Sequence, residues 1–280
     1  MQVFKDRLRG IKRCPWKTAG YGFTAFSVLF TIIKGICHFL PSVEIKGCLA
    51  LAVVILISAL FGLIKIWKPF SIKIAVANFD TEIEVTFGDI FVQNGIRVVP
   101  VNEFFDSVLG KPVSENSLHG LFLNKCFSGH PQPFDNQVDK ELANEQCETI
   151  FRSEGKTKKY KIGTTAMVGA GQDKYLVFAL THTDVSNCMA TANVTMMWDA
   201  LQHVLQRARV ECSGYPLNLP LVGSGLSKIG LSTCHLLNLI ILAVMTETKV
   251  GKITKRIRIV LHRDRFEDID LRDIQNYWKE

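Results

Sequence analysis

The residues whose types and spacing best suit a chemical task are the glycines of segment 216–232, which reads PLNLPLVGSGLSKIGLS. A short apolar run breaks at Gly223–Gly225, and Gly230 precedes a long apolar segment that opens at Ser232. The order strand, glycine-rich turn, helix leaves backbone N–H groups free at a helix start, where they bind a phosphate or diphosphate. Glycine also accepts a positive φ and lets a ligand approach the backbone without meeting a Cβ atom.

This loop matches neither of the stricter phosphate-binding motifs. No Gly-Lys-Ser/Thr follows, as a Walker loop requires, and no acidic residue stands at the distance of a Rossmann fingerprint. The alternative is an ordinary turn between a strand and a helix, in which glycines serve tight packing. The loop alone leaves both interpretations open.

The eight cysteines do not indicate a metal site. None forms a C-x-x-C pair, and none has a histidine at the spacing of zinc ligands. Scattered cysteines are typical of a reducing compartment, and most act as small buried hydrophobic residues. We therefore expect no metal and no disulfide framework.

Two apolar runs, 20–40 and 47–67, dominate the first quarter of the 280-residue chain. Each is long enough to cross a hydrocarbon layer of about 30 Å as a helix. Lys34 and His38 lie in the last third of the first run and must reach toward the surface or face the partner helix. The short link 41–46 makes the pair a helical hairpin. The alternatives are a cleaved signal peptide for the first run and a buried helical pair of a soluble protein.

Positive charge gathers at the ends of the chain, whose net charge is +7. Lys65 lies near the end of the second run, Lys68 and Lys73 follow it, and a second basic cluster spans 249–265. Basic residues on both sides of the hairpin place both ends in the cytoplasm. The centre is close to neutral, which argues against a nucleic-acid partner. The basic residues of the first twenty positions are Lys5, Arg7, Arg9, Lys12, Arg13 and Lys17.

The rest of the chain alternates strand and helix patterns, which predicts an α/β layer structure with a mixed sheet and helices on both faces. Segment 232–244 is apolar but short, and it carries His235 and Asn238, so we expect a core helix and not a third span. The expected strands are 70–77, 82–87, 97–101, 161–168, 175–183, 217–222 and 256–262. The expected helices are 117–127, 139–151, 190–208, 232–247 and 266–278, with a proline-containing loop at 129–137.

Three short segments resemble, in their order along the chain, a macro domain: Phe87–Ile90 (FGDI), Val99–Asn102 (VPVN) and Leu221–Gly225 (LVGSG). The phrases VVPVNEFFDS, SLHGLF and PLVGSGLSKIGLS more specifically resemble the divergent macro domain of Thoeris anti-phage defence effectors. This resemblance covers roughly 70–280, and the two preceding apolar runs are similar to the membrane-anchored, ThsA-type form.

The resemblance implies the domain organisation. Residues 1–19 would be a basic cytoplasmic stretch, and 20–68 a transmembrane hairpin. Residues 69–280 would form a macro-like three-layer α/β/α domain with a mixed sheet. The protein would lie in the bacterial inner membrane as a multi-pass protein.

The same resemblance implies a function. A partner TIR-domain enzyme would cleave NAD and release an ADP-ribose-derived signal, in this class an amino-acid conjugate such as histidine–ADP-ribose. The macro domain would bind this signal, and the chain would form homo-oligomers and damage the lipid bilayer, which aborts infection. We expect no catalytic residue and no cofactor beyond this ligand. The alternative is a membrane-anchored ADP-ribosyl hydrolase, for which Glu103, Asp106 and His119 are the nearby acid–base candidates.

Site residues follow from the resemblance position by position. Asp89 would accept from the adenine amino group and Ile90 would offer its N–H, while Asn102 would bind the distal ribose. The usual Asn-Ala-Ala-Asn segment is here Val-Asn-Glu-Phe-Phe-Asp, which leaves room at the distal end for a charged group beside Glu103 or Asp106. The full set of expected ligand contacts is Asp89, Ile90, Asn102, Phe105, Asp106, Gly223, Ser224, Gly225, Leu226, Lys228, Ile229 and Gly230.

Overall fold

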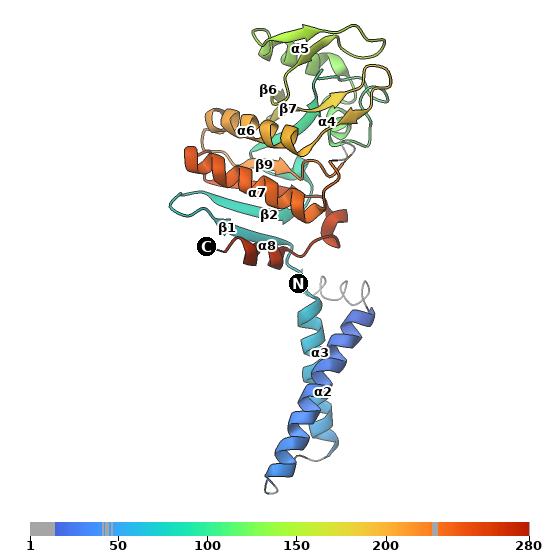
Figure 1. The fold of residues 1–280 in the computed structure, drawn as a ribbon, viewed down its shortest axis with the longest axis vertical. Helices are drawn as coiled ribbons and strands as arrows, with labels where there is room; N and C mark the ends of the chain where they lie inside the picture. The colour runs from blue at the N-terminus through green and yellow to red at the C-terminus, as the bar shows by residue number, and fades with distance from the viewer. Residues whose placement is uncertain (1–14, 41, 43–44, 46, 226–228, 280) are drawn as a thin grey trace. The chain divides into compact units, whose positions relative to one another are not determined.

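The computed structural model describes residues 15–40, 42, 45, 47–225 and 229–279. Contacts divide the chain into two compact units, residues 1–69 and 70–280. The first unit is a helical hairpin, and the second is an α/β domain (Figure 1).

The first unit pairs two apolar helices, α2 (Pro15–Phe39) and α3 (Cys48–Ile66). Both are long and apolar enough to cross a membrane. α2 begins at Pro15, ahead of the apolar run that starts at residue 20, because proline suits the first turn of a helix. Among the described residues of the pair only Val54, Ser58 and Gly62 are buried, so the other side chains stay partly or fully exposed, as lipid-facing side chains would be.

Small residues bring the two helices together. Val54, Ser58 and Gly62 form the buried stripe of α3 at a spacing of four residues. A Cβ atom at Gly62 would lie 3.0 Å from the carbonyl oxygen of Thr18 and 3.3 Å from the nitrogen of Gly22. Close backbone approach of this kind is a common way to pack helices in a bilayer.

The second unit is built on one mixed sheet. Its main strands are β1 (Ser71–Ala75), β2 (Glu82–Phe87), β3 (Ile96–Asn102), β6 (Thr165–Ala170), β7 (Asp173–Thr183), β9 (Leu217–Pro220) and β10 (Arg256–Leu261). They lie in the order β1-β2-β10-β9-β3-β7-β6, and the short β8 (Ala190–Thr191) pairs with β7. The five strands from β2 to β7 in this order are parallel, whereas β1 and β6 are antiparallel edge strands.

Helices cover both faces of this sheet, as the alternation of its core side chains shows. In β3, Val98 belongs to one hydrophobic cluster and Val99 to the other. The first cluster packs under α6 (Val194–Glu211), α7 (Thr233–Val250) and α8 (Leu271–Tyr277). The second packs under α4 (Leu118–Phe127) and α5 (Pro131–Glu141). In Figure 1, α6 and α7 run side by side over their face of the sheet. The result is the predicted three-layer α/β/α domain.

The expectation of a loop at 129–137 and a helix at 139–151 is wrong. Helix α5 starts at Pro131, and Cys147–Thr149 is strand β4, which pairs with β5 (Lys158–Tyr160). The two prolines, taken as loop residues, lie in the first turn of α5, where no backbone N–H is needed. The predicted closing helix 266–278 is also shorter, because a 3₁₀ turn (Arg263–Phe266) precedes α8.

The apolar segment after Ser232 is a core helix, as predicted. α7 has the length and composition of a membrane span, yet more than half of it is buried within this unit. Leu236, Leu237, Ile240 and Val244 contribute to the larger hydrophobic cluster.

Candidate functional site

The residues singled out from the sequence gather at one edge of the sheet. Asp89 follows β2, Asn102 ends β3 and the glycine loop follows β9. These strands are parallel, so their carboxyl ends meet at the same edge. In open α/β sheets this edge is where ligands bind.

Asp89 offers a charged acceptor at one end of this edge. It caps the short 3₁₀ helix Ile90–Val92, and its Oδ1 accepts from the backbone N–H of Phe91 at 2.9 Å. Its Oδ2 lies 3.0 Å from the Nζ of Lys125. Burial raises the pKa of Asp89, but the Phe91 N–H and the Lys125 ammonium outweigh burial, so this pKa lies below its usual value. Ile90 packs into the core directly beside it.

The glycine loop takes a strained turn that only glycine fits. Gly223 has φ 83°, and a Cβ atom there would lie 2.7 Å from Cδ1 of Ile229. Ser224 Oγ donates to the carbonyl of Leu221 at 2.9 Å, and Arg265 donates to the Ser224 carbonyl at 2.8 Å. At Gly225 no atom of the described residues lies within 4 Å of a Cβ position, which leaves room for a ligand beside this glycine.

The loop leads into the start of α7. Gly230 has φ 81°, and Ser232 caps the helix by accepting from the backbone N–H of His235 at 3.3 Å. The other first-turn N–H groups have no partner within the helix, which favours an anion nearby. Leu226 and Lys228, two of the expected contacts, lie outside the described residues.

Asn102 and Asp106 hold each other at the opposite end of the edge. Asn102 Nδ2 donates to Asp106 Oδ2 at 2.8 Å, and the Asp106 N–H donates to Asn102 Oδ1 at 3.1 Å. Asp106 is fully buried, and its carboxylate also accepts from Arg152 Nη1 at 2.9 Å and from the Lys156 N–H at 2.7 Å. The expectation that Asp106 meets a ligand is therefore not supported: its carboxylate fixes the loop after β4.

Phe105 is likewise part of the framework and not of the surface. Its side chain is fully buried, and its ring packs edge-on against Tyr160 at 5.5 Å between centroids. Its φ of 51° turns the chain sharply after β3, so that Asp106 points inward. Contact between Phe105 and a ligand, which the sequence predicted, does not fit this position.

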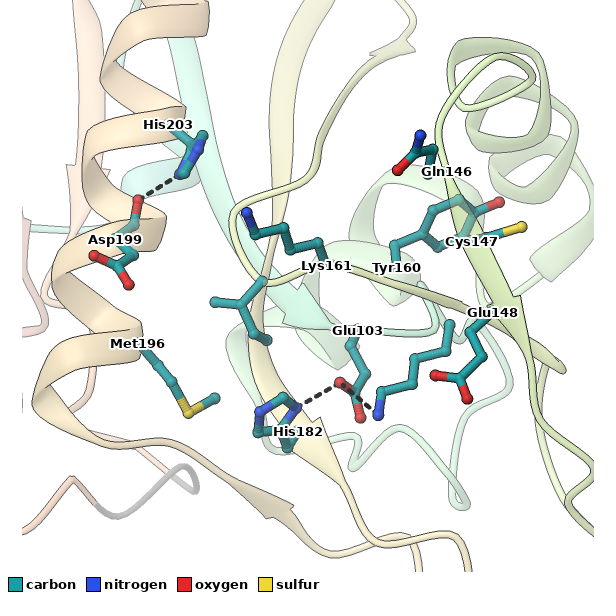
Figure 2. A pocket seen from close by; sticks show the side chains of 12 residues that line it. Glu103, Gln146, Cys147, Glu148, Tyr160, Lys161, His182, Met196, Asp199 and His203 are labelled. Carbon is teal, nitrogen blue, oxygen red and sulfur yellow. Dashed lines mark hydrogen bonds and ion pairs between the residues drawn. The ribbon is translucent and has the colours of Figure 1, made fainter.

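The sequence analysis missed His182, which forms a pair with Glu103. Glu103 Oε2 lies 2.5 Å from His182 Nδ1, and Oε1 accepts from the Thr183 N–H at 3.1 Å. Lys159 Nζ stands 3.8 Å from the same Oε2. Figure 2 shows Glu103 and His182 facing each other at one side of the cleft. A histidine near the carboxyl end of an expected strand, just after its apolar run 175–180, was the available sequence signal.

Two open pockets meet at this pair, with volumes of ≈ 710 Å³ and ≈ 470 Å³. The larger lies between the β4–β5 hairpin and α6 (Figure 2). It carries charges of both signs, from Glu148 and Asp199 and from Lys159 and Lys161. A group with both an ammonium and a carboxylate would find partners there.

The comparison with protein families decides where this arrangement belongs. The family described as "Thoeris protein ThsA, Macro domain" matches residues 83–262. The chain belongs to this family. A comparison with curated proteins gave no match.

Solved macrodomains share the fold of this ThsA macro domain. The Oceanobacillus iheyensis macrodomain with ADP is 11% identical, with a TM-score of 0.53 over 74% of this chain and 96% of that one. The same macrodomain with MES bound is 12% identical, with a TM-score of 0.52 over 74% of this chain and 96% of that one. At such identities the likeness establishes the fold alone.

Two of the acid–base candidates of this ThsA macro domain are withdrawn from solvent. Asp106 is fully buried, as described above. His119 lies in α4 and is buried as well, with its ring beside that of Phe134 in α5. Burial, and then the charge of Lys156, lowers the pKa of His119 to about 3, so its ring is neutral. Its Nε2 has no hydrogen-bond partner among the described residues. Glu103, the third candidate, lines both pockets described above.

Proposed function

We propose that this chain is an anti-phage defence effector whose macro domain binds an ADP-ribose-derived signal. One observation carries the proposal: Asp89, Asn102 and the glycine loop converge at the carboxyl edge of parallel strands in a ThsA macro domain. The fold is shared with an Oceanobacillus iheyensis macrodomain that was solved with ADP.

The roles follow the order of groups along the ligand. The ionised Asp89 accepts from the adenine amino group, and the backbone N–H of Ile90 adds a donor. The loop at Gly225, with the start of α7, cradles the diphosphate through backbone N–H groups. Asn102 then stands beside the distal ribose, although its side chain also holds Asp106.

The terminal group of the ligand would enter the cleft beyond Asn102. The mixed charges of Glu148, Asp199, Lys159 and Lys161 suit an amino-acid group, which agrees with a conjugate such as histidine–ADP-ribose. Glu103 was expected to pair with the ammonium, but both of its oxygens already have partners. Exposed Glu148 and Asp199 are the better carboxylates for that contact.

Ligand binding to the macro domain would change the assembly of the helical hairpin. A partner TIR-domain enzyme supplies the ligand, and ligand binding favours a homo-oligomer whose α2 and α3 disrupt the bacterial inner membrane and abort infection, with both termini in the cytoplasm. A ligand shifts such an equilibrium only by its higher affinity for the assembled state. We expect it to order the loop 223–230 or the segment 153–161.

Calorimetric titration of the full-length chain in lipid nanodiscs tests the binding step. ADP-ribose and histidine–ADP-ribose should both bind, the conjugate more tightly. Gly225→Glu should weaken binding on the order of 100-fold, because a carboxylate beside the diphosphate repels it. Gly225→Gln adds nearly the same bulk without charge and is the matched control, with a smaller loss. If neither nucleotide binds the folded wild type, the proposal fails.

The oligomeric state tests the output step separately. Saturating conjugate should shift the full-length chain toward larger assemblies in mass photometry, and Gly225→Glu should abolish the shift. An unchanged distribution with saturated binding would contradict ligand-driven assembly while leaving the receptor role intact.

A further inference from the structure

The pair Glu103–His182 is held in place by the sheet itself. The register of β3 and β7 jumps between Val101 and Asn102, so that β7 contains an additional residue just before its end. A bulge of this kind redirects the side chains that follow it. The Glu103 N–H then donates to the Thr181 carbonyl at 3.0 Å, and its side chain accepts from the Thr183 N–H. Glu103 and His182 are thereby fixed face to face.

The partners of Glu103 determine which nitrogen of His182 carries the proton. An ionised carboxylate only accepts hydrogen bonds, so the His182 Nδ1 at 2.5 Å must donate. In the neutral ring the remaining proton site, Nε2, is then an unprotonated acceptor. The side chain of Glu103 is 3% exposed and that of His182 is 51% exposed. Of the two side chains, His182 is therefore the one that meets solvent, and its Nε2 is the ring nitrogen that is not turned to Glu103.

A buried carboxylate that orients a solvent-facing imidazole is the arrangement of a general base. A simple clamp between β3 and β7 would not require a histidine, because the contact of Glu103 with the Thr183 N–H already joins the two strand ends. His182 also borders both pockets that meet beyond Asn102, where the distal part of the ligand would lie.

We propose that His182, positioned by Glu103, hydrolyses the bound conjugate slowly and so ends the signal; this inference rests on the proposed function, because it needs an ADP-ribose conjugate in the site. His182 Nε2 takes a proton from a water molecule, whose oxygen bonds to the anomeric carbon of the distal ribose. The bond from that carbon to the terminal group breaks, and its electron pair goes to the leaving nitrogen. That nitrogen receives the proton from the imidazolium, which gives ADP-ribose and the free amino acid.

Release of ADP-ribose from histidine–ADP-ribose by the full-length chain in nanodiscs tests this step. His182→Gln can still donate to Glu103 but cannot act as a base, and it should lower the release rate about 100-fold or more. His203→Gln is the matched control. His203 lines the same pocket, but its Nδ1 contacts the Asp199 carbonyl of its own helix at 2.8 Å and no carboxylate. It should leave the rate within about twofold of wild type, as expected for a group outside the reaction.

Glu103 acts through His182, so its test separates kcat from KM and includes a conservative variant. Glu103→Gln replaces the carboxylate that orients the imidazole by a neutral amide, and it should lower kcat for release with little change in KM. Glu103→Asp keeps a carboxylate and should recover part of the lost kcat. A purely structural role would give no such recovery and would change kcat and KM together.

Calorimetric binding of ADP-ribose to each variant separates this inference from the function on which it rests. Intact binding with no release above protein-free buffer, or with equal release by His182→Gln, would overturn the hydrolysis and leave the receptor in place. Absence of ADP-ribose binding by folded wild type would overturn both. Protein-dependent release that is lost only in His182→Gln and reduced in Glu103→Gln would support the pair.

Discussion

The two ends of the strand edge are built from different groups. At the glycine-loop end the described residues leave space at Gly225, and the capped start of α7 follows the loop. At the other end the structure is held by side-chain pairs, Asp106 with Arg152 and Glu103 with His182. A backbone cradle suits a group that every ligand shares, such as a diphosphate. The side-chain pairs hold the framework, and the charged side chains that line the pocket beside them, Glu148, Lys159, Lys161 and Asp199, suit the part of the ligand that varies.

The largest effect is expected at the side-chain end. The Asp106–Arg152 ion pair is fully buried, and the Arg152 guanidinium also stacks 4.2 Å above the ring of Phe104. Arg152→Ala leaves an unpaired buried carboxylate and should lower the free energy of unfolding by about 3–5 kcal/mol. Denaturant unfolding of the macro domain in nanodiscs measures the change.

A neighbouring exposed ion pair provides the control for this prediction. Lys111 lies 3.0 Å from Glu154, with both side chains open to solvent. Lys111→Ala should leave unfolding unchanged, because water already screens such a pair. Equal stability of the Arg152→Ala variant and wild type would show that the side-chain end is not held by its buried charges.

At the backbone end a smaller effect is expected, from a matched pair of glycines. Gly223→Ala forces an L-residue into the left-handed region, at about 1–2 kcal/mol, and brings its Cβ against Ile229. A Cβ atom at Gly225 meets none of the described residues, so Gly225→Ala should be close to neutral. Unfolding and ADP-ribose titration of both variants compare them. Equal behaviour of the two would contradict the strained turn at Gly223.

A substitution of Asp89 tests whether this side chain selects adenine over other bases. Asp89→Asn should weaken ADP-ribose about tenfold, as loss of a hydrogen bond to a charged group predicts, without weakening inosine diphosphate ribose, which lacks the amino group. The pKa of Asp89 is lowered below its ordinary value of 3.8. Its stabilising contribution is therefore fully present above 3.8 and is lost only as pH falls through the lower folded pKa. Loss of base selectivity already at pH 5 would contradict this assignment.

The smallest effect on binding is expected from the helical hairpin. Gly62→Leu would push α3 away from the backbone at Thr18 and Gly22. It should alter assembly and membrane damage in vesicle-leakage assays but leave ADP-ribose binding unchanged. Reduced ligand affinity in this variant would show that the first unit takes part in the site.

Local patterns in the sequence were enough to predict the strands of the sheet and the turn at the glycine loop. β-Branched runs predicted the strands, and the cap at Ser232 with its apolar periodicity predicted α7. Helix α5 was missed because prolines that begin a helix look the same in sequence as prolines of a loop.

The side-chain pairs at the other end could not be predicted from local patterns, because the two residues of each pair are far apart in the sequence. Asp106 was expected to contact the ligand. No residue near it in the sequence indicates that its carboxylate pairs with Arg152, 46 residues later, in the interior of the domain. The pairing of Glu103 with His182, 79 residues apart, depends on a bulge that no local pattern predicts.

A structure of the full-length chain with bound ADP-ribose tests the central claim most directly. The account predicts the diphosphate within hydrogen-bond distance of backbone N–H groups in the loop 223–230, with the adenine amino group at Asp89 and the distal ribose beside Asn102. A nucleotide bound elsewhere on the folded domain, or one whose diphosphate lies away from this loop, would contradict it.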